Sequence, residues 1–286
     1  MLLPDTGAAF KPVSEGFIMI IDVVPVWVLF FISVAIVMIS VEIGFRLGSK
    51  VRLKNDDERE SPASAIAGVI LGLQAFMLAF TFGIVSERFD QKKEFVREEA
   101  NAIRTTWHRA DFLPEPDRGK SKALLEEYLE RRIAVGQGRD TELARKGLGH
   151  ALRVQQKLWE IAVVHGKTDL NSDIGALLVE SVNEISSLHA MRVNVGLQSR
   201  IPTPIWAVLL SLLILGMLGV GYHTAIAESR RSRVTPILAI SFSLVIALIA
   251  ALDFPGAKLI PVSQLPLVNV LEEMKAASGV DTTEQP

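Results

Sequence analysis

The residues best suited to chemistry lie in an acidic segment, Glu98 to Ile103, that reads Glu-Glu-Ala-Asn-Ala-Ile. Two carboxylates that share acid–base work must face each other across a site. Adjacent residues on a helix diverge by about 100°, so Glu98 and Glu99 do not form such a pair. Glu98 and Asn101 lie three residues apart and can contact one partner from the same helix face. The simpler interpretation, which we favour, is that the two glutamates are solvated or salt-bridged charges.

The sequence lacks the residue patterns of common catalytic and metal sites. It contains no cysteine, which excludes disulfides, thiolate nucleophiles and cysteine zinc sites. Zinc needs convergent ligands, and the five histidines do not have ligand spacing. They are His108, His150, His165, His189 and His223. Nucleophile-elbow, zinc-protease and P-loop motifs are also absent. We therefore predict no catalytic residue, no metal, no cofactor and no enzymatic activity.

The composition is that of a membrane protein. Hydrophobic residues make up 49% of the 286 residues, and they gather in long runs. The net charge of −2 gives no basic field for nucleic acid. A helix of about 20 apolar residues crosses the roughly 30 Å hydrocarbon core of a bilayer. Since four such runs are present, we predict an all-α polytopic membrane protein with four transmembrane helices. A helical-bundle domain is inserted between spans 2 and 3.

The predicted boundaries follow the apolar runs and the prolines and glycines between them. The first span is expected at 17–41, the third at 205–227 and the fourth at 234–252, whereas the bundle helices are expected at 118–135, at 140–165 and from 171 towards 201. The resulting division is an irregular N-terminal tail at 1–16, spans 1 and 2 at 17–86, a soluble helical bundle at 87–200, spans 3 and 4 at 201–254, and a polar C-terminal tail at 255–286 with one short helix at 267–277.

One uninterrupted stretch, residues 63–113, connects the membrane to the predicted bundle. Its apolar part, Ala63 to Ser86, passes into a charged periodic segment, and no proline follows until Pro114. We therefore predict one helix that crosses the bilayer and projects beyond it. In the projecting part, apolar residues recur at intervals of three, four or seven, which predicts a buried seam. They are Phe89, Val96, Ala100, Ile103, Trp107 and Ala110.

The membrane part of this helix carries two further patterns. Small residues at multiples of four let another helix approach closely. They are Ala67, Ala75, Ala79 and Gly83. One position on, Gly72, Phe76, Phe80 and Ile84 form a row spaced by four. Contact with lipid or with a neighbouring helix is the simpler interpretation of these rings. A pore lining is the alternative, in which Arg88 and Lys92 just beyond the stripe raise the local anion concentration.

Orientation follows from lysine and arginine in the short loops. The two short loops carry Arg46, Lys50, Arg52, Lys54, Arg59, Arg230, Arg231 and Arg233, whereas the tails carry Lys11, Lys258 and Lys275. This count places the short loops in the cytoplasm and the helical domain outside, across the cell (inner) membrane. Basic residues on the domain side of span 2 nearly remove the asymmetry if they are included.

Several motifs together resemble the bestrophin-like four-span family of bacterial membrane proteins. These motifs are Leu78 to Phe82, Arg88-Phe89, Glu98 to Ile103, Arg109-Ala-Asp, Leu113-Pro-Glu-Pro and Leu252-Asp-Phe-Pro255. Bestrophins are pentameric anion channels whose second span lines the pore with apolar rings. The resemblance implies a neck formed by Phe76, Phe80 and Ile84. It also marks Glu98, Glu99, Asn101, Arg109 and Asp253 as family-motif positions.

The same resemblance implies a bilayer-embedded homo-oligomer, a pentamer, that passes inorganic anions. It also places the helical domain in the cytoplasm, opposite to the charge count, and the acidic calcium clasp of animal bestrophins has no counterpart in this sequence. The alternative hypothesis is a membrane-anchored interaction or scaffold module without transport activity. In that case the bundle binds a partner and the spans only anchor it.

Overall fold

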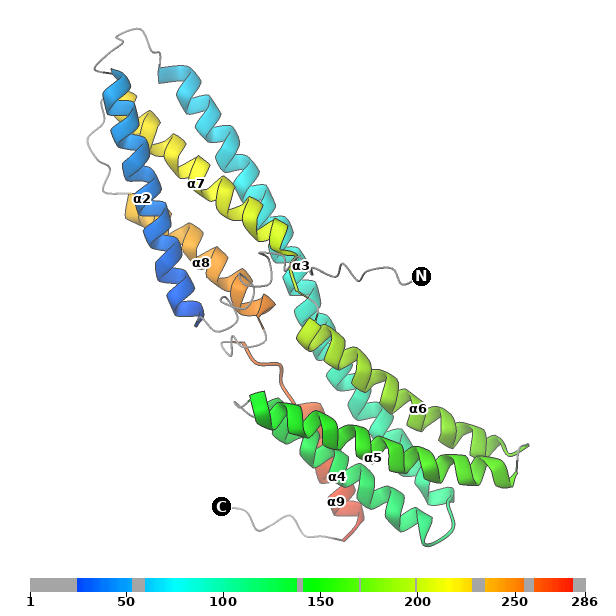
Figure 1. Cartoon of the computed structure of the whole chain (residues 1–286). Helices are drawn as coiled ribbons and strands as arrows, with labels where there is room; N and C mark the ends of the chain where they lie inside the picture. The colour runs from blue at the N-terminus through cyan, green and yellow to red at the C-terminus, as the bar shows by residue number, and fades with distance from the viewer. Residues whose placement is uncertain are drawn as a thin grey trace, which may run out of the picture. The chain divides into compact units, whose positions relative to one another are not determined.

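The computed structural model describes residues 25–52, 60–137, 141–169, 171–198, 200–227, 235–254 and 260–279. In these ranges the regular structure is helical, which confirms the all-α prediction (Figure 1). The helices are α2 (Val26–Arg52), α3 (Glu60–Arg109), α4 (Asp117–Gln137), α5 (Thr141–Thr168), α6 (Asp173–Val193), α7 (Thr203–Ile226), α8 (Thr235–Asp253) and α9 (Leu265–Ala277). A 3₁₀ turn, Ala110–Phe112, follows α3, and a π-helical turn, Asn194–Gln198, follows α6.

Among the described residues, four helices are long and apolar enough to cross a bilayer, namely α2, α3, α7 and α8. The chain is therefore a multi-pass membrane protein, and its helical segment lies between spans 2 and 3 as predicted. The first span differs in its limits, because α2 continues past residue 41 to Arg52. Charged residues do not by themselves end a helix. The 2.7 Å ion pair between Arg46 and Glu42, one helical turn apart, stabilises α2 beyond residue 41. Predicted span residues 17–24 and the tail at 1–16 lie outside the described ranges.

The long helix predicted at 63–113 is present as α3, which runs unbroken over 50 residues to Arg109. Its apolar part, up to Ser86, is long enough to cross the hydrocarbon core, so the charged part beyond it lies outside the membrane-spanning segment. The described residues fall into two compact units that meet near this point of the sequence. One, the membrane unit, contains the described residues up to 87 together with those of 200–260, and the other, the bundle unit, contains those of 88–199 together with 261–279.

In the membrane unit, glycines bring α2 and α7 into backbone contact. A side chain at Gly44 would overlap the backbone of Leu218, and one at Gly221 would overlap the backbone of Val41. Helix α3 packs on α7 in a similar way, with Ala67 against Gly219. Such close approaches are the usual means of helix association in a bilayer, where apolar burial supplies little driving force.

In the bundle unit, residues from α3, α4, α5, α6 and α9 share one apolar core. The predicted seam of α3 is buried there from Val96 to Ala110, and Phe89 is half-buried. Residues 255–286 were expected to form a polar tail with a helix at 267–277. That helix is α9, and its apolar face lies within the bundle core through Leu267, Val270 and Met274.

The ends of the bundle helices follow local chemistry. Ser172 caps α6, since its hydroxyl accepts the Gly175 N–H at 3.1 Å, and the start predicted at 171–173 is confirmed. Helix α5 was expected to end at residue 165, but it continues to Thr168. Helix α6 was expected to run towards Ile201, but its α-helical part ends at Val193.

Candidate functional site

A buried ionic cluster occupies the centre of the bundle unit. The Glu99 side chain on α3 is 0% exposed and accepts hydrogen bonds from donors on α4 and α6. Arg132 donates to both carboxylate oxygens, with distances of 3.1 and 3.3 Å. The Tyr128 hydroxyl donates to Oε1 at 2.6 Å, and Arg192 donates to Oε2. The carboxylate thus lies between two guanidinium groups, of which one is bidentate.

Helix periodicity explains why these side chains meet. Glu99 falls three residues after Val96 and four before Ile103, so it shares the buried face of α3. Tyr128 and Arg132 lie four residues apart on α4. His189 and Arg192 similarly lie three residues apart on α6, so each helix directs a pair of polar side chains into the core.

The network extends from Tyr128 to α5 and from Arg192 to the chain before α9. Gln155 Nε2 donates to the Tyr128 hydroxyl at 3.2 Å, and His189 Nδ1 lies 3.3 Å from the same oxygen. The Tyr128 hydroxyl has one proton and uses it in the hydrogen bond to Glu99. A neutral His189 therefore donates to this oxygen from Nδ1–H. Arg192 Nη2 donates to Gln264 Oε1 at 3.1 Å.

Burial and the two arginines decide the protonation of this cluster. Burial raises the pKa of Glu99, but Arg132, Arg192 and the Tyr128 hydrogen bond outweigh it and leave that pKa below its ordinary value. Burial and the charges of Arg132 and Arg192 lower the pKa of His189 to about 4. Burial and Glu99 raise the pKa of Tyr128. At neutral pH the cluster therefore holds one carboxylate, two guanidiniums and a neutral imidazole.

We expect the stability of the bundle to fall as the pH is lowered from about 6.5 to about 4. An unfolded His189 takes up a proton below about pH 6.5, whereas the folded side chain stays neutral until its pKa of about 4. The contribution to stability is complete above this window. Replacing His189 by asparagine keeps an N–H donor near Tyr128 but removes the titration, so the melting temperature of His189→Asn should fall less between pH 7.5 and 5. Equal losses in both proteins would contradict this assignment.

A second candidate feature is the outward face of α3 in the membrane unit. Phe76 is 65% exposed and Phe80 is 58% exposed. Gly68, Gly72 and Gly83 lie on the same half of the helix, and a side chain at any of them would meet no atom within 4 Å. No described residue of the chain covers this face with its two rings and three glycines.

The five candidate pore residues do not lie on one face of α3. They are Phe76, Phe80, Ile84, Arg88 and Lys92. A row spaced by four residues turns about 40° at each step, so Lys92 lies about 160° around the helix from Phe76. Phe76 and Phe80 share the exposed face, whereas Ile84, Arg88 and Lys92 are half-buried. Lys92 lines a pocket of the bundle unit beside Arg192.

The family-motif candidates have different roles. Glu98 and Asn101 are exposed, whereas Glu99 is salt-bridged in the core. Arg109 donates from Nη1 to the Leu177 carbonyl and so connects the end of α3 to α6. Asp253 is buried, and its Oδ1 accepts the Ile201 N–H at 2.9 Å, which connects the end of α8 to the residues just before α7.

Sequence reasoning missed most of the buried cluster, as well as one polar residue of span 2. In its own segment Tyr128 resembles an apolar seam position, and the register of Glu99 with Val96 and Ile103 was the pattern that could have revealed its burial. In span 2, Gln74 is fully buried, and neither amide atom has a hydrogen-bond partner among the described residues. Placing a polar amide inside an apolar span costs free energy, so a lone amide there is a functional-site candidate.

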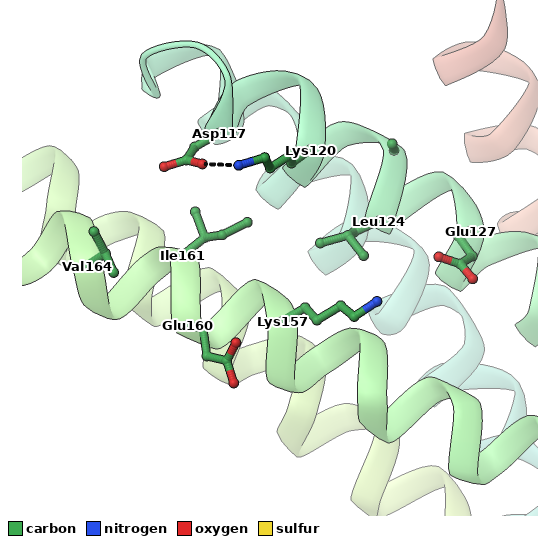
Figure 2. A pocket seen from close by; sticks show the side chains of 9 residues that line it. Asp117, Lys120, Leu124, Glu127, Lys157, Glu160, Ile161 and Val164 are labelled. Carbon is green, nitrogen blue, oxygen red and sulfur yellow. Dashed lines mark hydrogen bonds and ion pairs between the residues drawn. The ribbon is translucent and has the colours of Figure 1, made fainter.

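An open groove of about 540 Å³ lies between α4 and α5 (Figure 2). Leu124 and Ile161 point between the two helices, and charged side chains surround them. Asp117 at one end accepts from His165 at 2.9 Å and from Lys120 at 3.3 Å, and these contacts lower the pKa of Asp117. Over the described part of the chain, no group of three or more His, Asp or Glu residues is arranged to hold a metal ion.

The chain is similar in sequence to a known protein family and in fold to a solved structure. A family model described as the bestrophin-like domain matches residues 31–255. A solved crystal structure, described in its title as that of a membrane protein, is similar in fold, with a TM-score of 0.57 and 13% sequence identity. The alignment covers 91% of this chain and 99% of that one. No curated protein matches the sequence.

Proposed function

Because the chain belongs to the bestrophin-like family, we propose that it forms an oligomeric anion channel in which α3 lines the pore. The observation that supports this most is the uncovered face of α3. A side chain added at Gly44, Gly48 or Gly221 would meet backbone atoms of a neighbouring helix. A side chain added at Gly68, Gly72 or Gly83 of α3 would meet no described atom within 4 Å, although close packing is the common use of glycine in membrane helices. A symmetric assembly supplies the missing neighbours.

In such an assembly each exposed side chain of α3 becomes a ring around the axis. Phe76 and Phe80 then form two apolar constrictions, and Ile84 continues them. Apolar rings of this kind close a narrow pore by dewetting. Arg88 follows directly along the helix and attracts anions towards the constriction by long-range electrostatics. No acid–base or nucleophilic chemistry is needed for this function.

The test is chloride efflux from liposomes that contain the purified protein, with protein-free liposomes as the control. We expect efflux that increases with the amount of oligomeric protein. Folded oligomers that release no more chloride than protein-free liposomes would overturn the channel proposal.

Orientation can be tested separately with a reporter fused after Gln137, at the end of α4. The charge of the short loops favours a bundle unit outside the cytoplasm, in the cell (inner) membrane. We therefore expect a periplasm-active reporter, such as a phosphatase, to be active at this position. Activity of a cytoplasmic reporter there would reject the charge argument and favour the bestrophin arrangement.

A membrane-anchored interaction module is the second candidate function. The groove between α4 and α5 supports it, since an apolar floor with a charged rim suits a protein segment (Figure 2). In this case the spans hold the bundle at the membrane and conduct nothing. Chloride efflux therefore separates the two candidates.

A further inference from the structure

A small pocket of the bundle unit lies directly beside the buried cluster. Its volume is about 140 Å³. Its walls come from α3, from the end of α6 with the π-helical turn, and from the segment before α9. They are formed by Lys92, Phe95, Val96, Arg192, Val195, Gly196, Val262 and Gln264. The polar groups in this wall are a guanidinium, an ammonium and a carboxamide, with no carboxylate among them.

The charge of the cluster next to this pocket is not balanced. Two guanidiniums, Arg132 and Arg192, share Glu99, and no other carboxylate among the described residues contacts either group within the cluster. Burial and the neighbouring Arg132 lower the pKa of Arg192, although Glu99 acts in the opposite direction. An uncompensated buried charge is costly, and an anion in the adjoining pocket would remove that cost.

Arg192, which lines the pocket, also retains hydrogen-bonding capacity. Its bonds to described residues are one from Nη1 to Glu99 and one from Nη2 to Gln264. A guanidinium has five N–H donors, so three remain for a ligand. Gly136 of α4 leaves room for the Gln264 side chain. A side chain at position 136 would lie within 2.7 Å of Gln264 Oε1.

The turn that ends α6 shapes the remaining wall. It is π-helical over Asn194–Gln198 and contributes Val195 and Gly196 to the pocket. A side chain at Gly196 would meet no described atom within 4 Å, so the space beside this residue is open. Single π turns inside or after α-helices occur frequently at functional sites.

We propose that this pocket binds a small anion between Arg192 and Lys92. Its volume is below the roughly 300–1,000 Å³ of sites for drug-sized ligands. Since one water occupies about 30 Å³ of liquid, the pocket accepts an ion of a few atoms with little accompanying water. A halide, nitrate, phosphate or short carboxylate satisfies this chemistry. The site lies in the bundle unit and is independent of whether the spans conduct.

The experiment is thermal unfolding of the full-length protein in detergent, with gluconate replaced stepwise by bromide at constant ionic strength. Gluconate is too large for the pocket and serves as the reference anion. We expect the melting temperature to rise and saturate with bromide, as required for a ligand that binds only the folded protein. Repeating the titration with nitrate, phosphate and acetate then ranks the anions.

Three variants show where the anion binds. Lys92→Gln should weaken bromide binding at least tenfold, and Arg192→Gln should abolish it. Arg97→Gln removes one exposed cation from the same helix and should titrate like the wild type. If Arg192→Gln fails to fold, the comparison of bromide affinity between Lys92→Gln and Arg97→Gln still tests the proposal. A non-saturating rise in wild type, or equal bromide affinity in Lys92→Gln and wild type, would overturn the proposal.

Discussion

Replacing Glu99 by glutamine is expected to lower the free energy of unfolding by about 3–5 kcal/mol. The substitution keeps the size of the side chain but removes the charge shared by buried Arg132 and partly buried Arg192. Arg132 and Arg192 would then repel each other in the core. Tyr128 would also lose its charged acceptor. The measurement is thermal or denaturant unfolding of the purified protein in detergent.

Glu98→Gln is the matched control, because it makes the same chemical change one residue away on the exposed side of α3. Its effect should stay within about 0.5 kcal/mol. A double variant, Glu99→Gln with Arg192→Gln, should recover part of the loss, since removing one guanidinium relieves the repulsion. Equal stability of the two single variants would show that the cluster does not hold the bundle together.

Replacing both Phe76 and Phe80 by alanine is expected to raise chloride efflux several-fold. Smaller side chains widen the two apolar rings and allow water to remain in the constriction. Both side chains are exposed in the chain, so their removal leaves no cavity in its core. The fold and the oligomer should therefore survive, which size-exclusion chromatography can verify alongside the efflux assay.

The control for this variant is Ile237→Ala with Leu244→Ala on α8. These side chains are similarly exposed and apolar, but they lie on a different span. Their replacement should leave efflux unchanged. An increase of the same size in both double variants would indicate general leakiness rather than a gate on α3.

The helices and spans could be predicted because apolar run length, proline and helix period are local properties. The continuity of α3 follows from the absence of any proline before Pro114. The burial of α9 could not be predicted in this way. Its segment mixes Leu267, Val270 and Met274 with acidic residues, and only contact with the bundle distinguishes it from an exposed helix.

The candidate functional features could also be predicted only in part. Exposure of Phe76 and Phe80 agrees with a row of rings on one helix face. The ionic cluster depends on contacts between residues 29 to 93 positions apart in the sequence, so no single segment contains the pattern. Glu99 and Glu98 are identical in type, and only the register with Val96 and Ile103 separates the buried residue from the exposed one.

The most direct test of the pore proposal uses the absence of native cysteine. Phe76→Cys and Ile237→Cys each introduce one thiol at positions that are 65% and 62% exposed in the chain. Both variants are reconstituted and treated with a charged methanethiosulfonate reagent while chloride efflux is recorded. We predict that the reagent blocks efflux through Phe76→Cys and leaves Ile237→Cys unaffected. Undiminished efflux from fully modified Phe76→Cys would contradict a pore lined by α3.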